Sequence, residues 1–242
     1  TPTFKLFGEA DLGGIFGDRL AKARVAEAAE LRHLVLLNRG DHFEPRPLPR
    51  EAQWAPAFGV SVADFDGDGK LDAFLAQNFF SVQPECPRND GGRGLLLLGD
   101  GTGSFRPADA AQTGIAIYGE QRGSAASDFD GDGRVDLLVA QNNDEARLFR
   151  NRQARPGLRV RLEAGRDNPI GIGAVVRPVT ASGVGPARVV TAGSGYWSQE
   201  SATLVFAGPE PIVALRVRWP GGREEEHAVA AGARQVVLKP QA

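Results

Sequence analysis

Short apolar runs separated by polar, glycine-rich turns fill most of this chain. The runs reach four residues, as in Leu95–Leu98, far below the ~20 apolar residues that a membrane-spanning helix needs. From about residue 155 onward, apolar and charged positions alternate, with Leu158, Val160 and Leu162 each followed by a charged residue. Strict alternation is typical of strands with one buried and one solvent-exposed face. The pattern predicts an all-β protein.

One unit occurs twice at a spacing of 128 − 64 = 64 residues. VSVADFDGDGKLDAFLAQNFF begins at Val60 and SAASDFDGDGRVDLLVAQNND begins at Ser124. A further apolar strand and polar turn follow each copy, and a similar strand at Leu34 precedes the first. Self-similarity of this kind predicts β-propeller blades. Propellers close with four to eight blades and this sequence supplies about two and a half, so we expect a partial propeller.

Three explanations remain open for the missing blades: truncation of a longer chain, blades supplied by another chain, or an open sheet array covered by other segments. We favour truncation. Asp18 followed by RLAKARVAEAAEL predicts one N-capped helix before the repeats. The expected domains are an N-terminal helical segment with a blade remnant over residues 1–33, propeller repeats over 34–154 and a small β-sandwich over 155–242.

The repeated acidic loops have the pattern DxDxDGxxD, which suits a hard cation. Alternate aspartates of a tight loop converge on one point, a backbone carbonyl adds an oxygen, and the ninth residue closes the cage. The first loop offers Asp64, Asp66, Asp68, the carbonyl of Lys70, and Asp72. The second offers Asp128, Asp130, Asp132, the carbonyl of Arg134, and Asp136.

An ordinary polar turn is the alternative, but four adjacent carboxylates repel one another unless a cation neutralises them. We therefore expect two structural Ca²⁺ sites, with magnesium the weaker alternative because it resists an all-protein cage. Calcium affinities of ~10⁻⁴–10⁻³ M, as in extracellular modules, would place the protein in an extracellular or periplasmic setting.

The two loops between short strands resemble the FG-GAP or VCBS-type repeats of integrin-like propellers, whose aspartates bind calcium. The C-terminal segment resembles the ASPIC/UnbV domain through NPIGIGA at Asn168–Ala174, AGSGYWSQ at Ala192–Gln199 and VRWPGG at Val217–Gly222. Where that domain usually has a Phe-Gly-Leu-Gly turn, this chain has Phe206-Ala207-Gly208-Pro209. The combination is similar to the cartilage-acidic-protein-like family, which implies extracellular binding or adhesion.

Other candidate features carry less information. Tyr196 and Trp197 could form a surface for a protein or glycan partner, although a buried packing role is favoured for them. The tripeptide Arg39–Asp41 is interpreted as a turn, and Gly99–Gly103 as a hairpin turn. The three histidines are dispersed along the sequence and the single cysteine, Cys86, has no metal-ligand neighbours.

A net charge of −2 argues against a nucleic-acid surface. We expect a calcium-binding extracellular or periplasmic binding or adhesion module, with a protein or glycan partner and no membrane span. The alternatives are an accessory subunit of a larger periplasmic complex and the non-catalytic part of a secreted propeller enzyme. A catalytic role is not favoured, because the sequence displays no local convergence of titratable residues of a catalytic kind and its histidines are dispersed.

Overall fold

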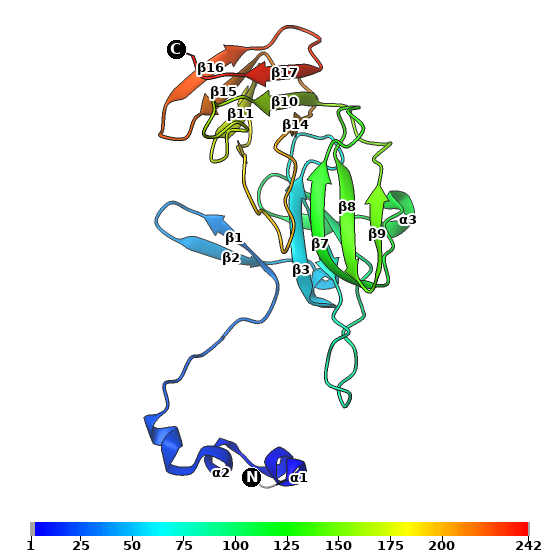
Figure 1. Cartoon of the computed structure of the whole chain (residues 1–242), viewed down its shortest axis with the longest axis vertical. Coiled ribbons are helices and arrows are strands. Elements are labelled where there is room, and N and C mark those ends of the chain that lie inside the picture. The colour runs from blue at the N-terminus through cyan, green and yellow to red at the C-terminus, as the bar shows by residue number, and fades with distance from the viewer. Residues whose placement is uncertain (1–2, 242) are drawn as a thin grey trace. The chain divides into compact units, whose positions relative to one another are not determined.

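The computed structural model describes residues 3–241, mostly as β-sheets with few helices (Figure 1). The chain divides between Arg32 and His33 into two compact units. The all-β expectation is confirmed at this level, and no helix within residues 3–241 is long and apolar enough to cross a membrane. The first unit contains α1 (Phe4–Glu9), α2 (Leu12–Phe16) and the 3₁₀ helix η1 (Gly17–Lys22).

The N-capped helix predicted after Asp18 is wrong in its cap and its extent, because Asp18 lies inside η1, whose N-cap residue, Phe16, makes no side-chain cap hydrogen bond. The 3₁₀ helix ends at Lys22, and residues 23–31 have no regular secondary structure and are exposed. Helices gain most of their stability by packing an apolar face, and the apolar face of this segment is weak. The two short α-helices that do form begin at side-chain caps, because Thr3 accepts from the Leu6 amide and Asp11 from the Gly14 amide.

The repeats form three antiparallel sheets in the second unit. The first is a hairpin of β1 (Leu34–Asn38) and β2 (Phe43–Pro47). The second contains β3 (Ala57–Ala63), β4 (Asp72–Gln77), β5 (Leu95–Gly99) and β6 (Phe105–Pro107). The third contains β7 (Glu120–Ser127), β8 (Asp136–Asn142) and β9 (Asp144–Phe149). Short helices η2 (Arg50–Gln53) and α3 (Ala110–Thr113) precede β3 and β7.

The second and third sheets pack face to face, with β3 beside β7 (Figure 1). The hydroxyls of Ser61 and Ser124 are 2.8 Å apart in this buried contact. Phe74 and Ala76 of β4 share one apolar core with Leu137 and Val139 of β8. The loops Arg39–Asp41 and Gly99–Gly103 lie at the turns of the β1–β2 and β5–β6 hairpins, as predicted.

Two further sheets form the C-terminal part. The first comprises β10 (Leu158–Leu162), β14 (Leu204–Phe206) and β17 (Gln235–Leu238), with β10 and β17 parallel. The second comprises β11 (Val175–Thr180), β12 (Gly183–Val184), β13 (Arg188–Val189), β15 (Ala214–Arg218) and β16 (Glu224–Ala228).

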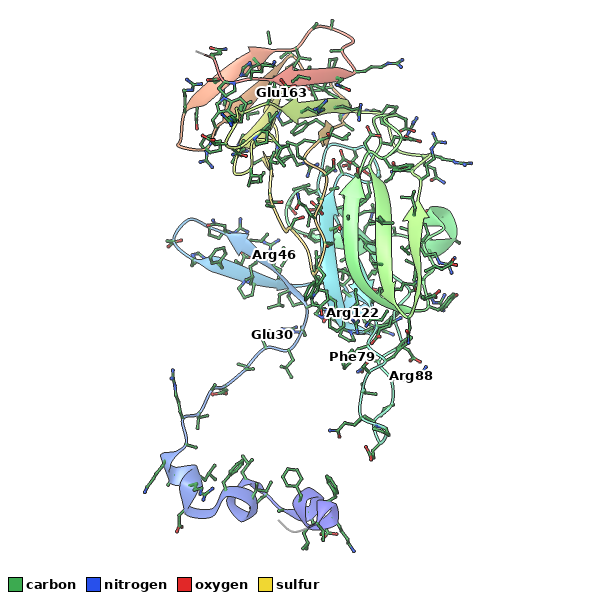
Figure 2. All side chains as sticks on the ribbon, viewed as in Figure 1. Glu30, Arg46, Phe79, Arg88, Arg122 and Glu163 are labelled. Carbon is green, nitrogen blue, oxygen red and sulfur yellow. The ribbon has the colours of Figure 1, made fainter. Side chains whose placement is uncertain are left out.

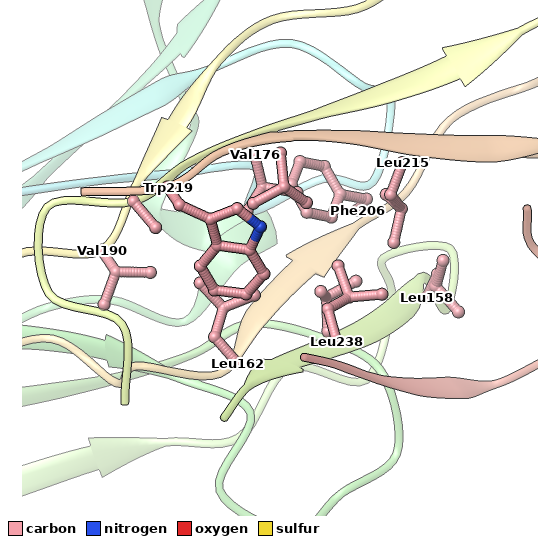
Figure 3. Packing of buried hydrophobic residues seen from close by; sticks show 11 residues of the cluster. Leu158, Leu162, Val176, Val190, Phe206, Leu215, Trp219 and Leu238 are labelled. Carbon is pink, nitrogen blue, oxygen red and sulfur yellow. The ribbon is translucent and has the colours of Figure 1, made fainter. Parts of the chain in front are cut away.

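Both C-terminal sheets contribute to one hydrophobic core (Figure 3). Leu158, Val160 and Leu162 are buried in it, so the predicted alternation along β10 is confirmed. A second alternating run, over Val213–Trp219, is buried at Leu215, Val217 and Trp219, which are 0%, 0% and 3% exposed. Val213, where that run begins, lies before β15 and is 53% exposed, so the predicted burial fails at this position.

Candidate metal centres

The first acidic loop, residues 64–72, connects β3 to β4 and is shaped by its own carboxylates. Asp64 is 4% exposed, and its two oxygens accept hydrogen bonds from the Gly67 amide at 2.7 Å and the Gly69 amide at 3.0 Å. Asp72 accepts from the Phe65 amide at 2.8 Å and, across to the end of β5, from the Gly99 amide at 2.9 Å. Positive φ at Gly67 and Gly69 allows the chain to fold this tightly.

Three of the four predicted carboxylates in the first loop converge. Oxygens of Asp64, Asp66 and Asp72 lie within 4.8 Å of one another. Asp68 is not in this group and instead accepts from the Lys70 amide at 2.8 Å, with the Lys70 ammonium 3.2 Å away. The loop therefore brings together the first, third and ninth positions of the motif and turns the fifth toward its own lysine.

The second acidic loop, residues 128–136, repeats this arrangement between β7 and β8. Oxygens of Asp128, Asp130 and Asp136 lie within 4.8 Å of one another, while Asp132 pairs with Arg134 at 2.9 Å. Asp136 accepts from the Phe129 amide at 2.9 Å, the contact equivalent to that of Asp72 with Phe65. Two loops of nearly identical sequence thus fold into the same local geometry.

The electrostatics of the first loop favour a bound cation. Burial raises the pKa of Asp72 to about 6, although hydrogen bonds from the Gly99 and Phe65 amides oppose the shift and the neighbouring Asp66 and Asp64 add to it. Burial likewise raises the pKa of Asp64. Removing several carboxylates from water is unfavourable unless positive charge compensates them. The all-oxygen donor sets fit a hard cation such as calcium.

Both loops lie against the C-terminal part of the chain. A Cβ built on Gly67 would stand 2.6 Å from the Arg155 nitrogen, and one on Gly133 would stand 2.8 Å from the Gly157 oxygen. The Gly157 amide donates to the Gly133 carbonyl at 2.7 Å. The pairing of Gly133 with Gly157 could not be read from the sequence, because it joins two separate segments.

The turn Phe206-Ala207-Gly208-Pro209 also lies beside the first loop. A Cβ on Gly69 would be 3.3 Å from the Ala207 carbonyl oxygen and 3.5 Å from the Gly208 Cα. The Arg155 guanidinium donates to the Gly208 carbonyl at 2.8 Å. This turn, where the sequence departs from the usual domain pattern, is therefore part of the contact between loop and C-terminal sheets.

A loop over residues 190–203 leaves the C-terminal sheets and lies along β3 and β7. The Ser201 amide donates to the Ala126 carbonyl at 3.1 Å, and the Val62 amide donates to Glu200 at 3.2 Å. A bridge between Gly195 and Ser198 closes the tip of this loop. The packing of the AGSGYWSQ motif on the repeats was not predicted from the sequence.

Tyr196 and Trp197 occupy the tip of the 190–203 loop. Tyr196 is 42% exposed and stacks edge-on against Phe58, with the ring centroids 5.6 Å apart. Trp197 is 91% exposed and has φ of +51°, a backbone region that bulky residues rarely adopt. The buried role favoured from sequence is therefore wrong for Trp197, because the bridge between Gly195 and Ser198 turns its side chain outward.

A buried ion pair lies beside the aromatic rings of Phe58 and Phe79. The Arg122 guanidinium carbon is 3.9 Å from the centroid of Phe58 and 5.5 Å from that of Phe79. Arg122 also pairs with Glu120 at 2.6 Å. Figure 2 shows Arg122 and Phe79 together at one end of the repeat sheets, with Arg88 in the adjoining loop. No sequence signal marked these residues, because they are brought together from three separate segments.

Comparisons with known proteins bear on the C-terminal part most directly. Residues 164–242 match the family described as ASPIC and UnbV, which confirms that part of the expected resemblance. Cartilage acidic protein 1 of Homo sapiens is 28% identical over 206 residues, covering 79% of this chain and 29% of that protein. The Xenopus tropicalis protein of the same name is 28% identical over 196 residues, covering 76% and 28%. The chain thus spans less than a third of the length of these relatives. The FG-GAP or VCBS character of the repeats stays a prediction.

Proposed function

We propose that this chain is a calcium-stabilised binding module in which two Ca²⁺ sites join propeller-type repeats to an ASPIC/UnbV-like β-sandwich. The observation that carries the proposal is the convergence of two carboxylate triads at the contact with the C-terminal sheets. Calcium bound there would neutralise the acidic loops and fix their shape. The module acts as a scaffold, with no catalytic step, and its calcium requirement suits an extracellular or periplasmic setting.

Equivalent positions in the two larger repeat sheets support a partial propeller. Phe74 pairs with Leu96 across β4 and β5, and Leu138 pairs with Leu148 across β8 and β9. Phe74 is fully buried against the third sheet, whereas Leu138 is 43% and Leu148 49% exposed. The second sheet buries this face against the third sheet. The third sheet leaves the equivalent face exposed.

The opposite flank has a matching free surface. Leu36 of β1 pairs with Pro45 in the same way that Leu97 of β5 pairs with Pro107. Leu97 is fully buried but Leu36 is 56% exposed. We propose that further blades, from a longer protein or from another chain, cover both flanks. The second possibility corresponds to an accessory subunit of a larger periplasmic complex.

The exposed tip of the 190–203 loop is the proposed contact for a protein or glycan partner. A 91% exposed tryptophan beside a half-exposed tyrosine offers apolar rings of the kind enriched in binding hot spots. The Tyr196 ring is supported from below by Phe58, so this surface is held in position before a partner binds.

Thermal unfolding with calcium tests the proposal. The chain is stripped with EDTA, and calcium or equimolar magnesium is then titrated back while the mass in solution is recorded. We expect the midpoint to rise with calcium. Each occupied site should contribute ~2.7 kcal/mol of stabilisation at one hundred times its dissociation constant. Magnesium should produce a smaller rise.

Two variants serve as controls for this experiment. A double variant, Asp64→Asn with Asp128→Asn, should lose the calcium response. Asp100→Asn should keep it, because Asp100 caps the β5–β6 turn by accepting from the Thr102 amide at 2.7 Å and lies outside both triads. An identical response in the wild type and the double variant would refute the proposed calcium sites.

A further inference from the structure

The two acidic loops differ in the positive charge that contacts them. In the second loop, Arg150 pairs with Asp130, Arg134 pairs with Asp132 at 2.9 Å, and Arg159 pairs with Asp128 at 2.7 Å. In the first loop, the only ion pair among the described residues joins Lys70 to Asp68. Three arginines therefore contact carboxylates in one loop, whereas one lysine does so in the other.

Arg159 reaches the second loop from the C-terminal sheets. It lies on β10, where its guanidinium donates to the Gln235 side chain of β17 at 2.7 Å. The same guanidinium stands over Gly131, at 3.6 Å from where a Cβ would lie. Its Nε approaches the Asp128 Oδ2 outside the direction of a hydrogen bond, so this contact is an ion pair.

The two carboxylate oxygens of Asp128 have different surroundings. Its side chain is fully buried, and Oδ2 takes both Arg159 and the Gly133 amide, the latter at 3.0 Å. Oδ1 is buried with no hydrogen-bond partner. A buried carboxylate oxygen without a partner is unfavourable, and it lies within the triad that Asp128 forms with Asp130 and Asp136. A ligand that the protein does not itself supply would satisfy this oxygen.

The carboxylates of the first triad lack such ion pairs. Among the described residues, neither Asp64, Asp66 nor Asp72 has a basic side chain within ion-pair distance. Arg188 is close enough to Asp64 and Asp72 to favour their charged forms, but it forms no ion pair with either and its Nη1 has no hydrogen-bond partner. Within the described part of the chain, the carboxylates of the first triad therefore have no direct ion pair, whereas two of the three in the second triad have one.

We propose that the two loops are unequal cation sites. The first binds calcium more tightly, and the second is partly neutralised by Arg150 and Arg159, so that it keeps its shape without calcium and binds the ion more weakly. Calcium affinity depends on the number of ligand charges, and a guanidinium both repels a divalent cation and competes for the same oxygens. Arg159 belongs to the C-terminal sheets, so calcium in the second loop alters the ion pair between Arg159 and Asp128 that joins these sheets to the loop. This inference rests on the proposed calcium sites.

Calorimetric titration of the full chain with calcium alone tests the inequality. We expect two classes of site whose affinities differ by ~10-fold or more. Asp64→Asn should remove the tighter class and Asp128→Asn the weaker. In the Asp64→Asn background, Arg159→Gln should raise the affinity of the remaining site by about the same factor.

Matched variants separate the charge effect from a folding defect. Arg161→Gln changes an exposed arginine on the same strand and should leave the second site unchanged. Arg150→Gln removes a 53% exposed side chain that does not belong to the C-terminal sheets, and it should raise the affinity as Arg159→Gln does. Circular dichroism and the unfolding midpoint of each variant show whether it is folded.

The outcomes are distinguishable. Two equal affinities, or a lower affinity in both Arg159→Gln and Arg150→Gln, would overturn the inference and leave the proposed calcium sites intact. The second result would mean that the arginines position the ligands. An absence of calcium binding in the folded wild type would overturn both proposals.

Discussion

Glu120 is a charged residue held inside the repeats at the start of β7. It is 5% exposed and accepts hydrogen bonds from the Phe80 amide at 2.7 Å, from Arg122 at 2.6 Å and from Asn142 at 3.0 Å. Burial alone would raise its pKa, but these bonds and the charge of Arg122 outweigh burial and hold the pKa below its usual value. The charged form is therefore favoured by folding.

The sign of this shift predicts acid sensitivity. A depressed folded pKa means that the stabilisation from Glu120 is fully present above the pKa of the unfolded chain and is lost as the pH falls through the folded pKa. Urea unfolding measured from about pH 7 to about pH 3 at constant calcium should show this loss. Glu120→Gln should start less stable and decline less steeply. Parallel pH profiles for the two proteins would contradict the prediction.

Substitutions at Trp197 and at its neighbour Tyr196 should have different effects on the free energy of unfolding. Trp197→Asn is expected to leave the free energy of unfolding unchanged or raise it by up to ~1 kcal/mol, because Asn tolerates positive φ and little buried area is lost. Tyr196→Ala should lower it by at least ~1 kcal/mol through loss of the contact with Phe58. Urea denaturation measures both changes, and a large loss in Trp197→Asn would show that the ring is packed.

At the scale of elements, the repeat sheets are built to pack on one another. Residues that occupy equivalent positions differ in burial only because one sheet has a successor within the unit and the other does not. Sequence pattern alone cannot distinguish them, because both Phe74 and Leu138 are apolar residues in the same motif.

Replacing Phe74 and Leu138 by alanine should distinguish the covered sheet face from the uncovered one. Phe74→Ala is expected to destabilise the chain by ~3–5 kcal/mol, because it opens a cavity between two sheets. Leu138→Ala should change stability by no more than ~0.5 kcal/mol, since its side chain is already half exposed. Chemical denaturation of each variant provides the measurement. A comparable loss at Leu138 would mean that its face is already covered in solution.

At the scale of the whole second unit, the contact between the second loop and the C-terminal sheets should be sensitive to one added methyl group. Gly131 and Gly133 have φ of +77° and +84°, so alanine is strained at either position. At Gly133 the new methyl would also meet the Gly157 backbone, which cannot move aside as the Arg159 side chain near Gly131 can.

Gly133→Ala should therefore be less stable than Gly131→Ala by ~1–3 kcal/mol. Thermal unfolding in excess calcium compares the two proteins, and loss of docking should also split the transition of Gly133→Ala into two. Equal stabilities would show that the C-terminal sheets do not rely on this contact.

Local patterns predicted part of the local structure. The alternation at Leu158–Leu162 predicted β10 and its buried face, and the acidic motif placed Asp64 and Asp72 at the two ends of one tight loop. The helix expected after Asp18 failed because propensity without a packed apolar face is a weak determinant of structure. The pairing of Asp68 with Lys70 was also missed, since side-chain direction depends on contacts that the motif does not encode.

The sequence by itself determined the all-β character, the repeat and the positions of the two acidic loops, because these follow from periodicity and spacing along the chain. Only the tertiary structure decided that both loops meet the C-terminal sheets, that Arg159 contacts Asp128 and that Trp197 faces outward. Those features join segments that are separated along the sequence or depend on a loop held by another sheet. No local pattern specifies which distant basic side chain will pair with a given carboxylate.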